Sequence, residues 1–422
     1  MSKKTKIILL LVAVFIAVVV LYDFSSDKAL EKEIITSYAI SDPQFLRSIE
    51  SLLGPPIRSG NFTDTLVNGD EFFPAMLDAI GQAEKTITME TYIYWSGKVG
   101  QLFTTALSKK AHEGVRVNLL IDSVGSSKLD KKLFQEMEKN GVHLVRYNPT
   151  HWYTIHKLNN RTHRKILIVD GKVGFTGGAG IADIWLGNAK TKDNWRDTHF
   201  SVAGPAVAQM QAVFADNWME TTGEALQGSE YFPPLPELGM ERAQAFGSSP
   251  REGTEKTRLL YLLSIAAARK TIYMSNAYFV PDDLSVQHLI SAAKRGVKIQ
   301  IIAPGEITDT KVVRQASRSR WGELLEAGVE FYEYQPTMFH CKVFVADGIW
   351  STVGSTNFDN RSFRLNDEMN LNIFDTVFAR EQIKIFQQDL AKSRKVTLQE
   401  WKDRPFSEKF TEWAAGLLKH QM

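Results

Sequence analysis

The sequence predicts an α/β protein built from two repeated lobes related by a pseudo-twofold axis, with a transmembrane helix at the N-terminus. Three observations lead to this prediction: a long internal repeat, apolar strand patterns that alternate with helical ones, and one uninterrupted apolar run near the first residue. A length of 422 residues suits two domains that each bury a core. The expected parts are an anchor (1–24), a connecting segment (25–60), a first lobe (61–222), a linker (223–253) and a second lobe with a helical tail (254–422).

The apolar run at the N-terminus, Ile7–Tyr22, contains no charged residue. As a helix it would be about 24 Å long, and Lys6, Tyr22 and Phe24 can extend it to both interfaces of a bilayer. We interpret it as an uncleaved anchor rather than a signal peptide, because no small-residue cleavage site follows it. Lysines precede the run and acidic residues predominate after it, so the remaining chain is expected outside the cytoplasm.

The internal repeat relates two long stretches of the chain. AEKTITMETYIY (83–94) parallels ARKTIYMSNAYF (268–279), and HEGVRVNLLID (112–122) parallels KRGVKIQIIAP (294–304). In each half, helical patterns alternate with apolar strands, which is typical of a sheet covered on both faces. Repeats of this size indicate two copies of a domain rather than a solenoid.

Each half contains one copy of a short polar pattern within an apolar, β-branched run. The copies are THRKILIVDGKVGFTGGAG (162–180) and FHCKVFVADGIWSTVGSTN (339–357). A lone His-x-Lys is more often a half-buried histidine beside a lysine that reaches solvent, but the second copy outweighs that interpretation. Residues two apart in a strand share a face, so His and Lys should point to one place. The matched residues are His163, Lys165 and Asp170 in the first copy and His340, Lys342 and Asp347 in the second.

Two such patterns that meet across a pseudo-twofold axis would bring two imidazoles and two ammonium groups together. This arrangement is unfavourable unless an anion binds there, and a phosphoryl group fits. The lysines can neutralise its oxygens, while one histidine attacks phosphorus and the other protonates the leaving oxygen. A zinc site is disfavoured because a lysine accompanies each histidine, Cys341 is the only cysteine, and HExxH is absent. We therefore expect no metal and no cofactor.

The two halves are joined by a segment rich in Gly, Pro and Ser, residues 223–253, which we interpret as a linker. The C-terminal tail places apolar side chains among Lys and Arg, which suits either an interfacial helix or a helix packed on its own domain. Those side chains are Trp401, Phe406, Phe410, Trp413 and Leu417. A net charge of +2 gives no global field that favours nucleic acid.

The two motifs resemble the signature of the phospholipase D superfamily, H-x-K-x4-D-x6-G-[GS]-x-N. The second copy matches it in full, and the first has Gly180 where the second has Asn357. The phrases NNRTHRK, FTGGAGIAD, NWRDTHF, YQPTMFHCK and GSTNFDNRSFRLNDE resemble the bacterial cardiolipin synthase branch of that superfamily. The resemblance extends from about Asn61 to the C-terminus.

The resemblance implies two phospholipase D-like lobes and a metal-free, two-step exchange through a phosphohistidine. His163 would be the nucleophile and His340 the general acid, although the near symmetry of the motifs leaves this choice open. Lys165 and Lys342 would hold the phosphate oxygens. Asp170 and Asp347 belong to the signature, and we interpret them as mainly structural because they begin tight turns.

Further positions are expected to support the site. Ser355 and Asn357 would add hydrogen bonds on the second half. The first half has Gly178 and Gly180 at these positions, so it would have to use backbone amides for these hydrogen bonds or lack them. Asp197 and Glu368 occupy parallel positions downstream of the motifs, and the resemblance implies that each would accept from the far nitrogen of the nearby histidine and so fix its tautomer. Their sequence contexts are NWRDTHF and LNDEMNL.

The function implied is that of a membrane-anchored phosphatidyltransferase that joins phosphatidyl groups of two phosphatidylglycerol molecules to form cardiolipin. Alternatives are a phospholipase D that releases phosphatidic acid, a nucleic-acid phosphodiesterase, and an inactive lipid-binding scaffold. The expected partner is phospholipid in the membrane, with no nucleic acid and no obligate protein partner. The expected location is the bacterial inner membrane, with the catalytic part on the extracytoplasmic side.

Overall fold

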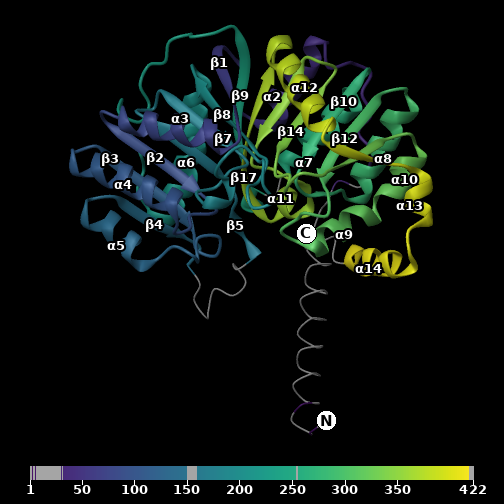
Figure 1. The fold of residues 1–422 in the computed structure, drawn as a ribbon. Helices are drawn as coiled ribbons and strands as arrows, with labels where there is room; N and C mark the ends of the chain where they lie inside the picture. Colours follow the sequence, from purple (N-terminus) through teal and green to yellow (C-terminus); the bar gives the residue numbers. More distant parts are fainter. Residues whose placement is uncertain are drawn as a thin grey trace. The chain divides into compact units, whose positions relative to one another are not determined.

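The computed structural model describes residues 32–149, 159–252 and 255–417, together with the isolated residues 2, 5 and 30 (Figure 1). The chain divides into two units, residues 1–33 and 34–422, and the description below concerns the second. The predicted anchor, Ile7–Tyr22, lies outside the described residues. Within the described part, no helix is both long and apolar enough to cross a membrane.

Helices and strands alternate along both halves, as the repeat predicts. The first half contains α2 (Pro43–Leu53), β1 (Arg58–Val67), α3 (Gly69–Gly81), β2 (Thr86–Thr91), α4 (Lys98–His112), β3 (Arg116–Asp122), α5 (Lys131–Lys139), β4 (His143–Tyr147), β5 (Arg161–Thr162), β6 (Lys165–Val169), β7 (Val173–Gly177), the 3-10 turn η2 (Asp183–Trp185), β8 (Thr198–Ala203) and α6 (Ala206–Thr222). The second half contains β9 (Glu241–Ser248), η3 (Pro250–Glu252), α7 (Lys256–Ala267), β10 (Thr271–Asn276), β11 (Phe279–Val280), α8 (Asp283–Lys294), β12 (Lys298–Pro304), α9 (Lys311–Ser319), α10 (Trp321–Glu326), β13 (Glu330–Tyr334), β14 (Lys342–Ala346), β15 (Trp350–Gly354), β16 (Phe358–Asp359), α11 (Asn360–Arg364), β17 (Asn366–Phe374), α12 (Thr376–Leu390), β18 (Ser393–Val396), α13 (Leu398–Asp403) and α14 (Phe406–Gly416).

One mixed sheet runs through both halves, and its strand order is nearly palindromic. The order is β18-β13-β12-β10-β14-β15-β17-β9-β1-β8-β7-β6-β2-β3-β4. The two halves meet where β9 and β1 pair in antiparallel fashion. Counted outward from this pair, the strands of the two halves correspond in their order and in their relative directions. In Figure 1 the first half lies on the left and the second on the right of this contact. This order supports the predicted pseudo-twofold relation between the lobes.

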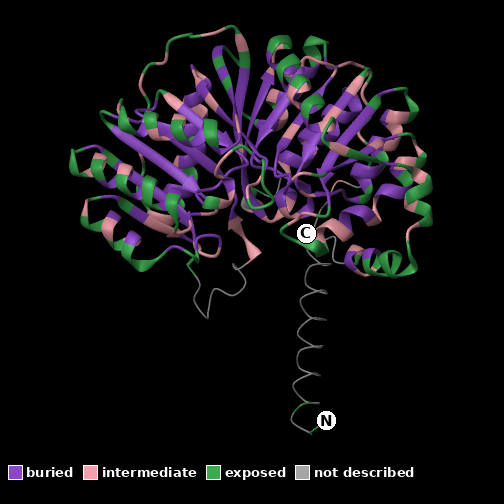
Figure 2. Ribbon diagram, in the orientation of Figure 1, coloured by how far each residue is buried: buried purple, intermediate pink, exposed green. Residues whose placement is uncertain are grey.

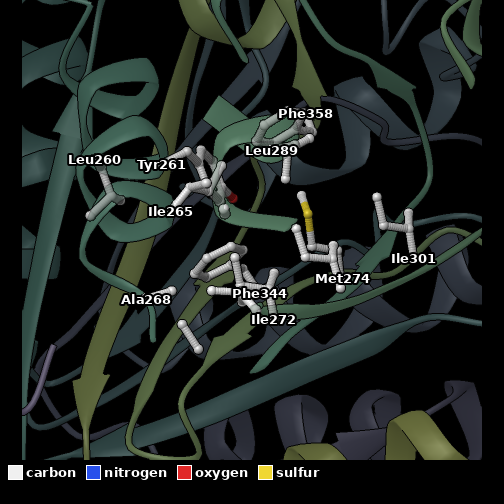
Figure 3. Close-up of a cluster of buried hydrophobic side chains, with 14 of the residues drawn as sticks. Leu260, Tyr261, Ile265, Ala268, Ile272, Met274, Leu289, Ile301, Phe344 and Phe358 are labelled. Atoms are coloured by element: carbon white, nitrogen blue, oxygen red, sulfur yellow. The ribbon is translucent and has the colours of Figure 1, made fainter. Parts of the chain in front are cut away.

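Helices cover both faces of the sheet, and the strands between them are buried (Figure 2). On one face, α3, α4 and α5 cover the first half, while α2, α7, α8 and α10 cover the second. Figure 3 shows part of the second of these cores, to which Leu260 and Tyr261 from α7 and Met274 of β10 belong. On the other face, α6 and α12 share a single apolar cluster with β9 and β17. This shared cluster binds the halves together.

Two elements occur where the sequence predicts only connections. Strand β9 lies inside the predicted linker, residues 223–253, and pairs with both β1 and β17 at the centre of the sheet. Its sequence, ERAQAFGS, has few apolar residues, so the usual strand pattern is weak. Helix α2 lies inside the connecting segment and packs through Phe45 and Ile49 into the core of the second half. It begins with Asp42 as N-cap and Pro43 at its first position.

Backbone pairing also crosses between the lobes beside each histidine. The short strand β5 pairs in parallel with the start of β17, and the amide of His163 donates to the carbonyl of Asp367 over 2.9 Å. In the second half, Phe339 forms a bridge to Arg196, and the amide of His340 donates to the Arg196 carbonyl over 2.7 Å. Each histidine therefore sits just before its strand, held against the opposite lobe, instead of within the strand itself.

Candidate active site

The two motif histidines line one cavity of about 430 Å³ between the lobes. Both rings are almost fully buried, with 7% of His163 and 5% of His340 exposed. Tyr92 contacts the ring of His163, with 5.3 Å between centroids. Trp185 and Trp195 contact the ring of His340, with centroid distances of 5.5 and 5.1 Å. The structure thus brings the two repeats together in one aromatic-walled pocket.

Each histidine is paired with a carboxylate from the other lobe. Nδ1 of His163 lies 2.9 and 3.0 Å from the two carboxylate oxygens of Glu368. Nδ1 of His340 lies 2.7 Å from Oδ2 of Asp197. Both carboxylates are fully buried. A carboxylate at Nδ1 fixes the proton there and leaves Nε2 as the free ring nitrogen.

The motif lysines are buried beside the histidines that they follow. Lys165 donates to the carbonyl of His163 over 2.7 Å. Lys342 donates to the carbonyl of His340 over 2.7 Å and also lies 3.1 and 3.2 Å from the two ring nitrogens. Both side chains are 3% exposed. The ammonium groups are therefore held close to the imidazoles, where a phosphoryl oxygen can reach them.

The surroundings of the two carboxylates differ. On the second lobe, the Ser355 hydroxyl donates to Glu368 over 2.5 Å. On the first lobe, the indole N–H of Trp185 donates to Asp197 over 3.0 Å. A side chain at Gly178, the counterpart of Ser355, would place its Cβ 2.2 Å from Asp197 Oδ1. A Cβ at Gly180 would lie 3.3 Å from the Trp185 ring. The glycines of the first motif thus leave room for an indole donor, which sequence reasoning did not identify.

The motif aspartates begin the hairpin turns and accept backbone hydrogen bonds. Asp170 accepts from the amides of Glu84, Lys85 and Thr86, over 2.9, 2.7 and 2.9 Å. Asp347 accepts from three amides in the repeat-related positions 269–271, over 2.8, 2.7 and 3.0 Å. Both aspartates have a positive φ, 52° and 54°. Neither lines the cavity.

Burial shifts the pKa values of the histidines and lysines downward. Burial lowers the pKa of His163 to about 4, against the opposing effect of Glu368, and Lys165 and Lys342 lower it further. Burial and Lys342 lower the pKa of His340, while Asp197 and Asp309 act in the opposite direction. Burial lowers the pKa of Lys165 to about 7 and also lowers that of Lys342. Burial is the largest cause of all four shifts, because it removes the hydration that stabilises the charged form, and the neighbouring carboxylates only partly offset it.

The two carboxylates shift so that they remain ionised. Burial alone would raise the pKa of Glu368, but His163, Lys165 and Ser355 outweigh it and lower the value. Burial likewise opposes ionisation of Asp197, and the neighbouring His340 and Lys342 reverse the effect and lower its pKa. At neutral pH the histidines are thus neutral donors to ionised carboxylates. An anion that enters the cavity would favour protonation of the rings and lysines.

Several cavity residues were absent from the sequence-based set. Tyr278 contacts His340 and hydrogen-bonds Asp309. Arg161, Arg361 and Asn366 also line the cavity. They lie just before the first motif or after the second, so proximity in sequence is the one signal that could have identified them. Among the residues with described coordinates, no group of three or more His, Cys, Asp or Glu is arranged to hold a metal ion.

The comparisons with known proteins agree with this geometry. A family model described as the phospholipase D-like domain of cardiolipin synthase matches residues 76–218 and 261–390, one segment in each lobe. The chain belongs to this family. Membership confirms the resemblance seen in the motifs, and it confirms that the chain is an enzyme of the phosphatidyltransferase type.

Relatives in this family are similar over most of the chain. A cardiolipin synthase of Geobacillus kaustophilus is 36% identical over 86% of this chain and 73% of its own length. Cardiolipin synthase 2 of Bacillus anthracis is 38% identical over 84% of this chain and 70% of its own length. Among solved structures, phosphatidylserine synthase from Haemophilus influenzae Rd KW20 aligns with a TM-score of 0.65 at 14% identity. That alignment covers 90% of this chain and all of the other. It confirms the predicted mixed α/β, two-lobe fold.

Proposed function

We propose that this chain transfers the phosphatidyl group of one phosphatidylglycerol to a second one, forming cardiolipin and releasing glycerol. The observation that carries the proposal is the pair of imidazole–carboxylate couples, one from each motif, at a single cavity with two buried lysines. Membership of the cardiolipin synthase family supports the choice of lipid and reaction.

His163 is the nucleophile in this proposal. Its Nδ1–H donates to Glu368, so the Nε2 lone pair is free to attack phosphorus. A pKa lowered to about 4 keeps the ring neutral at physiological pH. The bond from Nε2 to phosphorus forms as the bond from phosphorus to the glycerol oxygen breaks.

His340 is the general acid and then the general base. Once the anionic substrate is bound, His340 carries a second proton on Nε2; it gives this proton to the departing glycerol oxygen, and later takes a proton from the hydroxyl of the second phosphatidylglycerol. The different charges around the rings support this division. Lys165 and Lys342 both disfavour a proton on His163, whereas on His340 only Lys342 does so and Asp309 supplements Asp197 in favouring the proton. The anionic substrate itself would add to the basicity of His340.

Lys165 and Lys342 neutralise the non-bridging phosphoryl oxygens in both steps, with Asn357 as a further donor from the cavity wall. In the second step the acceptor hydroxyl attacks phosphorus and the phosphorus–Nε2 bond breaks. Water is the competitor at this point, and its attack would yield phosphatidic acid. The outcome depends on how the cavity holds the acceptor alcohol.

We also propose that the chain acts at the bacterial inner membrane, with Ile7–Tyr22 as its anchor and the catalytic part on the extracytoplasmic side. Helix α14 offers an interfacial surface, because Phe406, Phe410, Trp413 and Leu417 are 81, 55, 60 and 64% exposed at helical spacing. The opposite side of α14 is fixed to α9 by Glu412, which accepts from Arg318 over 2.8 Å. Thr310, the residue that caps α9, lines the cavity.

This membrane proposal predicts that Phe410→Glu with Trp413→Glu reduces turnover on phosphatidylglycerol vesicles more than turnover in detergent micelles. Val377→Glu with Met219→Glu, which places the same two charges on exposed apolar residues of α12 and α6, is the matched control. Equal losses on both substrates would contradict an interfacial role. For the orientation, protease added to intact spheroplasts should digest the catalytic part, and protection would contradict it.

The reaction itself is tested by mass spectrometry of lipid products. The purified full chain is incubated with phosphatidylglycerol, beside His163→Ala, His340→Ala and the exposed-histidine control His112→Ala. Cardiolipin and free glycerol should form with the wild type and the control alone. Phosphatidic acid without cardiolipin would identify a phospholipase D, and unchanged synthesis by either active-site variant would overturn the mechanism.

A further inference from the structure

The catalytic cavity carries a second cationic group besides the motif lysines. Arg161 and Arg361 both line it, each half-buried, from opposite lobes. The two arginines are held at one place. Arg361 donates to the carbonyl and side-chain oxygens of Asn159 over 3.1 and 2.7 Å, and Asn159 lies two residues before Arg161. The guanidinium groups therefore converge on the stretch of chain that leads into His163.

Asn366 joins this group from the second lobe. It is the register partner of Arg161 in the parallel pairing of β17 with β5. Its side-chain nitrogen lies 3.4 Å from Glu368, the carboxylate that holds His163. Its side-chain oxygen is buried and has no hydrogen-bond partner among the residues that the structure describes. The group formed by Arg161, Arg361 and Asn366 thus adjoins the proposed nucleophile.

The two guanidinium groups are poorly compensated. Their hydrogen bonds go to neutral carbonyl and amide oxygens of Asn159 and Asn160. Burial lowers the pKa of Arg361, and the charge of Arg161 adds to this effect, although Asp359 and Asp122 act in the opposite direction. Two guanidinium groups that line one cavity and hydrogen-bond neutral oxygens are suited to an anion with several oxygens, such as a phosphodiester.

We propose that Arg161, Arg361 and Asn366 form an acceptor subsite that binds the phosphodiester of the second phosphatidylglycerol. This inference rests on the proposed function, which requires two anionic lipids at one cavity. The acceptor's phosphate is joined to its attacking hydroxyl by a three-carbon glycerol. An anion site beside the reacting phosphorus would therefore direct that hydroxyl to the phosphohistidine in place of water. The free oxygen of Asn366 accepts a hydroxyl hydrogen of the same glycerol.

The subsite would favour an anionic acceptor, phosphatidylglycerol, over a neutral acceptor, glycerol. The proposal can therefore be tested by comparing these two acceptors. With deuterated glycerol as acceptor, the enzyme would return the phosphatidyl group to form deuterated phosphatidylglycerol. That exchange uses His163, His340 and the donor's phosphate, and it needs no second anion. Cardiolipin formation and glycerol exchange are measured by mass spectrometry in the same reaction mixture. Their ratio reports acceptor recognition and is independent of the amount of active enzyme.

We expect Arg361→Gln and Arg161→Gln to lower the ratio of cardiolipin to exchanged phosphatidylglycerol by about tenfold or more each, the size expected from one lost charge-assisted contact. Phosphatidic acid should increase relative to cardiolipin, because water meets less competition. Arg364→Gln is the matched control, since it removes the same charge from the same helix, α11, where Arg364 pairs with Glu255.

Two outcomes would overturn the subsite. An unchanged ratio in both variants would show that the arginines do not recognise the acceptor. An equal loss of cardiolipin formation and glycerol exchange would mean that they only hold residues 159–162 in place beside His163. Failure of the proposed function has a different result, because the wild type itself would then form no cardiolipin.

Discussion

The two halves of the active site have the same backbone plan but different polar surroundings. In each, a histidine just before a strand pairs across the lobe boundary with a buried carboxylate. The couple of His163 and Glu368 is completed by a serine hydroxyl and stands near two lysines. The couple of His340 and Asp197 is completed by an indole N–H and stands near Lys342 and a further carboxylate, Asp309. Repetition thus supplied the geometry, and substitutions around it supplied two different polar environments.

The largest effects that test the difference between the two halves are expected when each histidine is removed and the leaving group of the substrate is varied. Both His163→Ala and His340→Ala should reduce turnover of phosphatidylglycerol by at least about 10³-fold. A phosphatidyl ester of p-nitrophenol needs no proton on its leaving oxygen. With this ester, His340→Ala should recover a burst of p-nitrophenol close to one per enzyme, whereas His163→Ala should give none.

The burst is followed by stopped-flow absorbance of p-nitrophenolate. A burst from His163→Ala and none from His340→Ala would mean that the two roles are reversed. Equal bursts from both variants would remove the distinction between the halves.

Loss of the charge on Asp197 and loss of the charge on Glu368 should have different effects on the pH dependence of kcat. Asp197→Asn removes a charge that raises the pKa of His340, so the pKa of the acid falls and less of it is protonated at a given pH. The alkaline limb of kcat should therefore shift to lower pH, with a loss of about 10- to 100-fold at neutral pH. Glu368→Gln should cause a loss of similar size without this shift, because His163 acts as the neutral ring.

These profiles require kcat measured from pH 5 to 9 on mixed micelles. A downward shift in Glu368→Gln alone would assign the acid to His163. Thermal unfolding of each variant separates a change in protonation from a loss of folded enzyme.

The smallest effects are expected from the donors that complete each couple. Ser355→Ala and Trp185→Phe each remove one hydrogen bond to a carboxylate and should lower kcat roughly three- to tenfold. With the p-nitrophenyl ester, the burst rate of Trp185→Phe should return to the wild-type value, while that of Ser355→Ala should stay low. If the two variants respond alike to the leaving group, the serine and the indole do not serve separate steps.

The repeat made much of the architecture predictable. The matched motifs predicted which residues come together, and the alternation of helices and apolar strands predicted the two-lobe α/β fold. Both predictions rest on local sequence patterns that are present in each copy of the repeat. The predicted sharing of a cavity by His163 and His340 is reflected in the structure, although the roles of these residues stay predictions. The predicted anchor lies in residues that the structure does not describe.

Other features depend on contacts between distant segments and left little trace in the sequence. Nothing near Asp197 indicates that its partner is His340 in the other lobe, since parallel positions in a repeat suggest equivalence and not exchange. Trp185 supplies the hydrogen bond to Asp197 that no side chain at Gly178 can donate. The sequence does not indicate which nearby residue takes over this role. The polar sequence of β9 does not show the usual strand pattern. The strand is buried because it joins the two halves of the sheet, which is a contact between distant segments.

The crossed backbone pairing beside the histidines, His163 to Asp367 and His340 to Arg196, has a consequence during synthesis of the chain. The first lobe leaves the ribosome with its histidine but without Glu368, and with Asp197 but without His340. A nascent or proteolytically halved chain therefore contains no complete imidazole–carboxylate couple. Under the proposed mechanism, phosphatidyl transfer cannot begin until both lobes have docked, so premature reaction is prevented by the order of assembly.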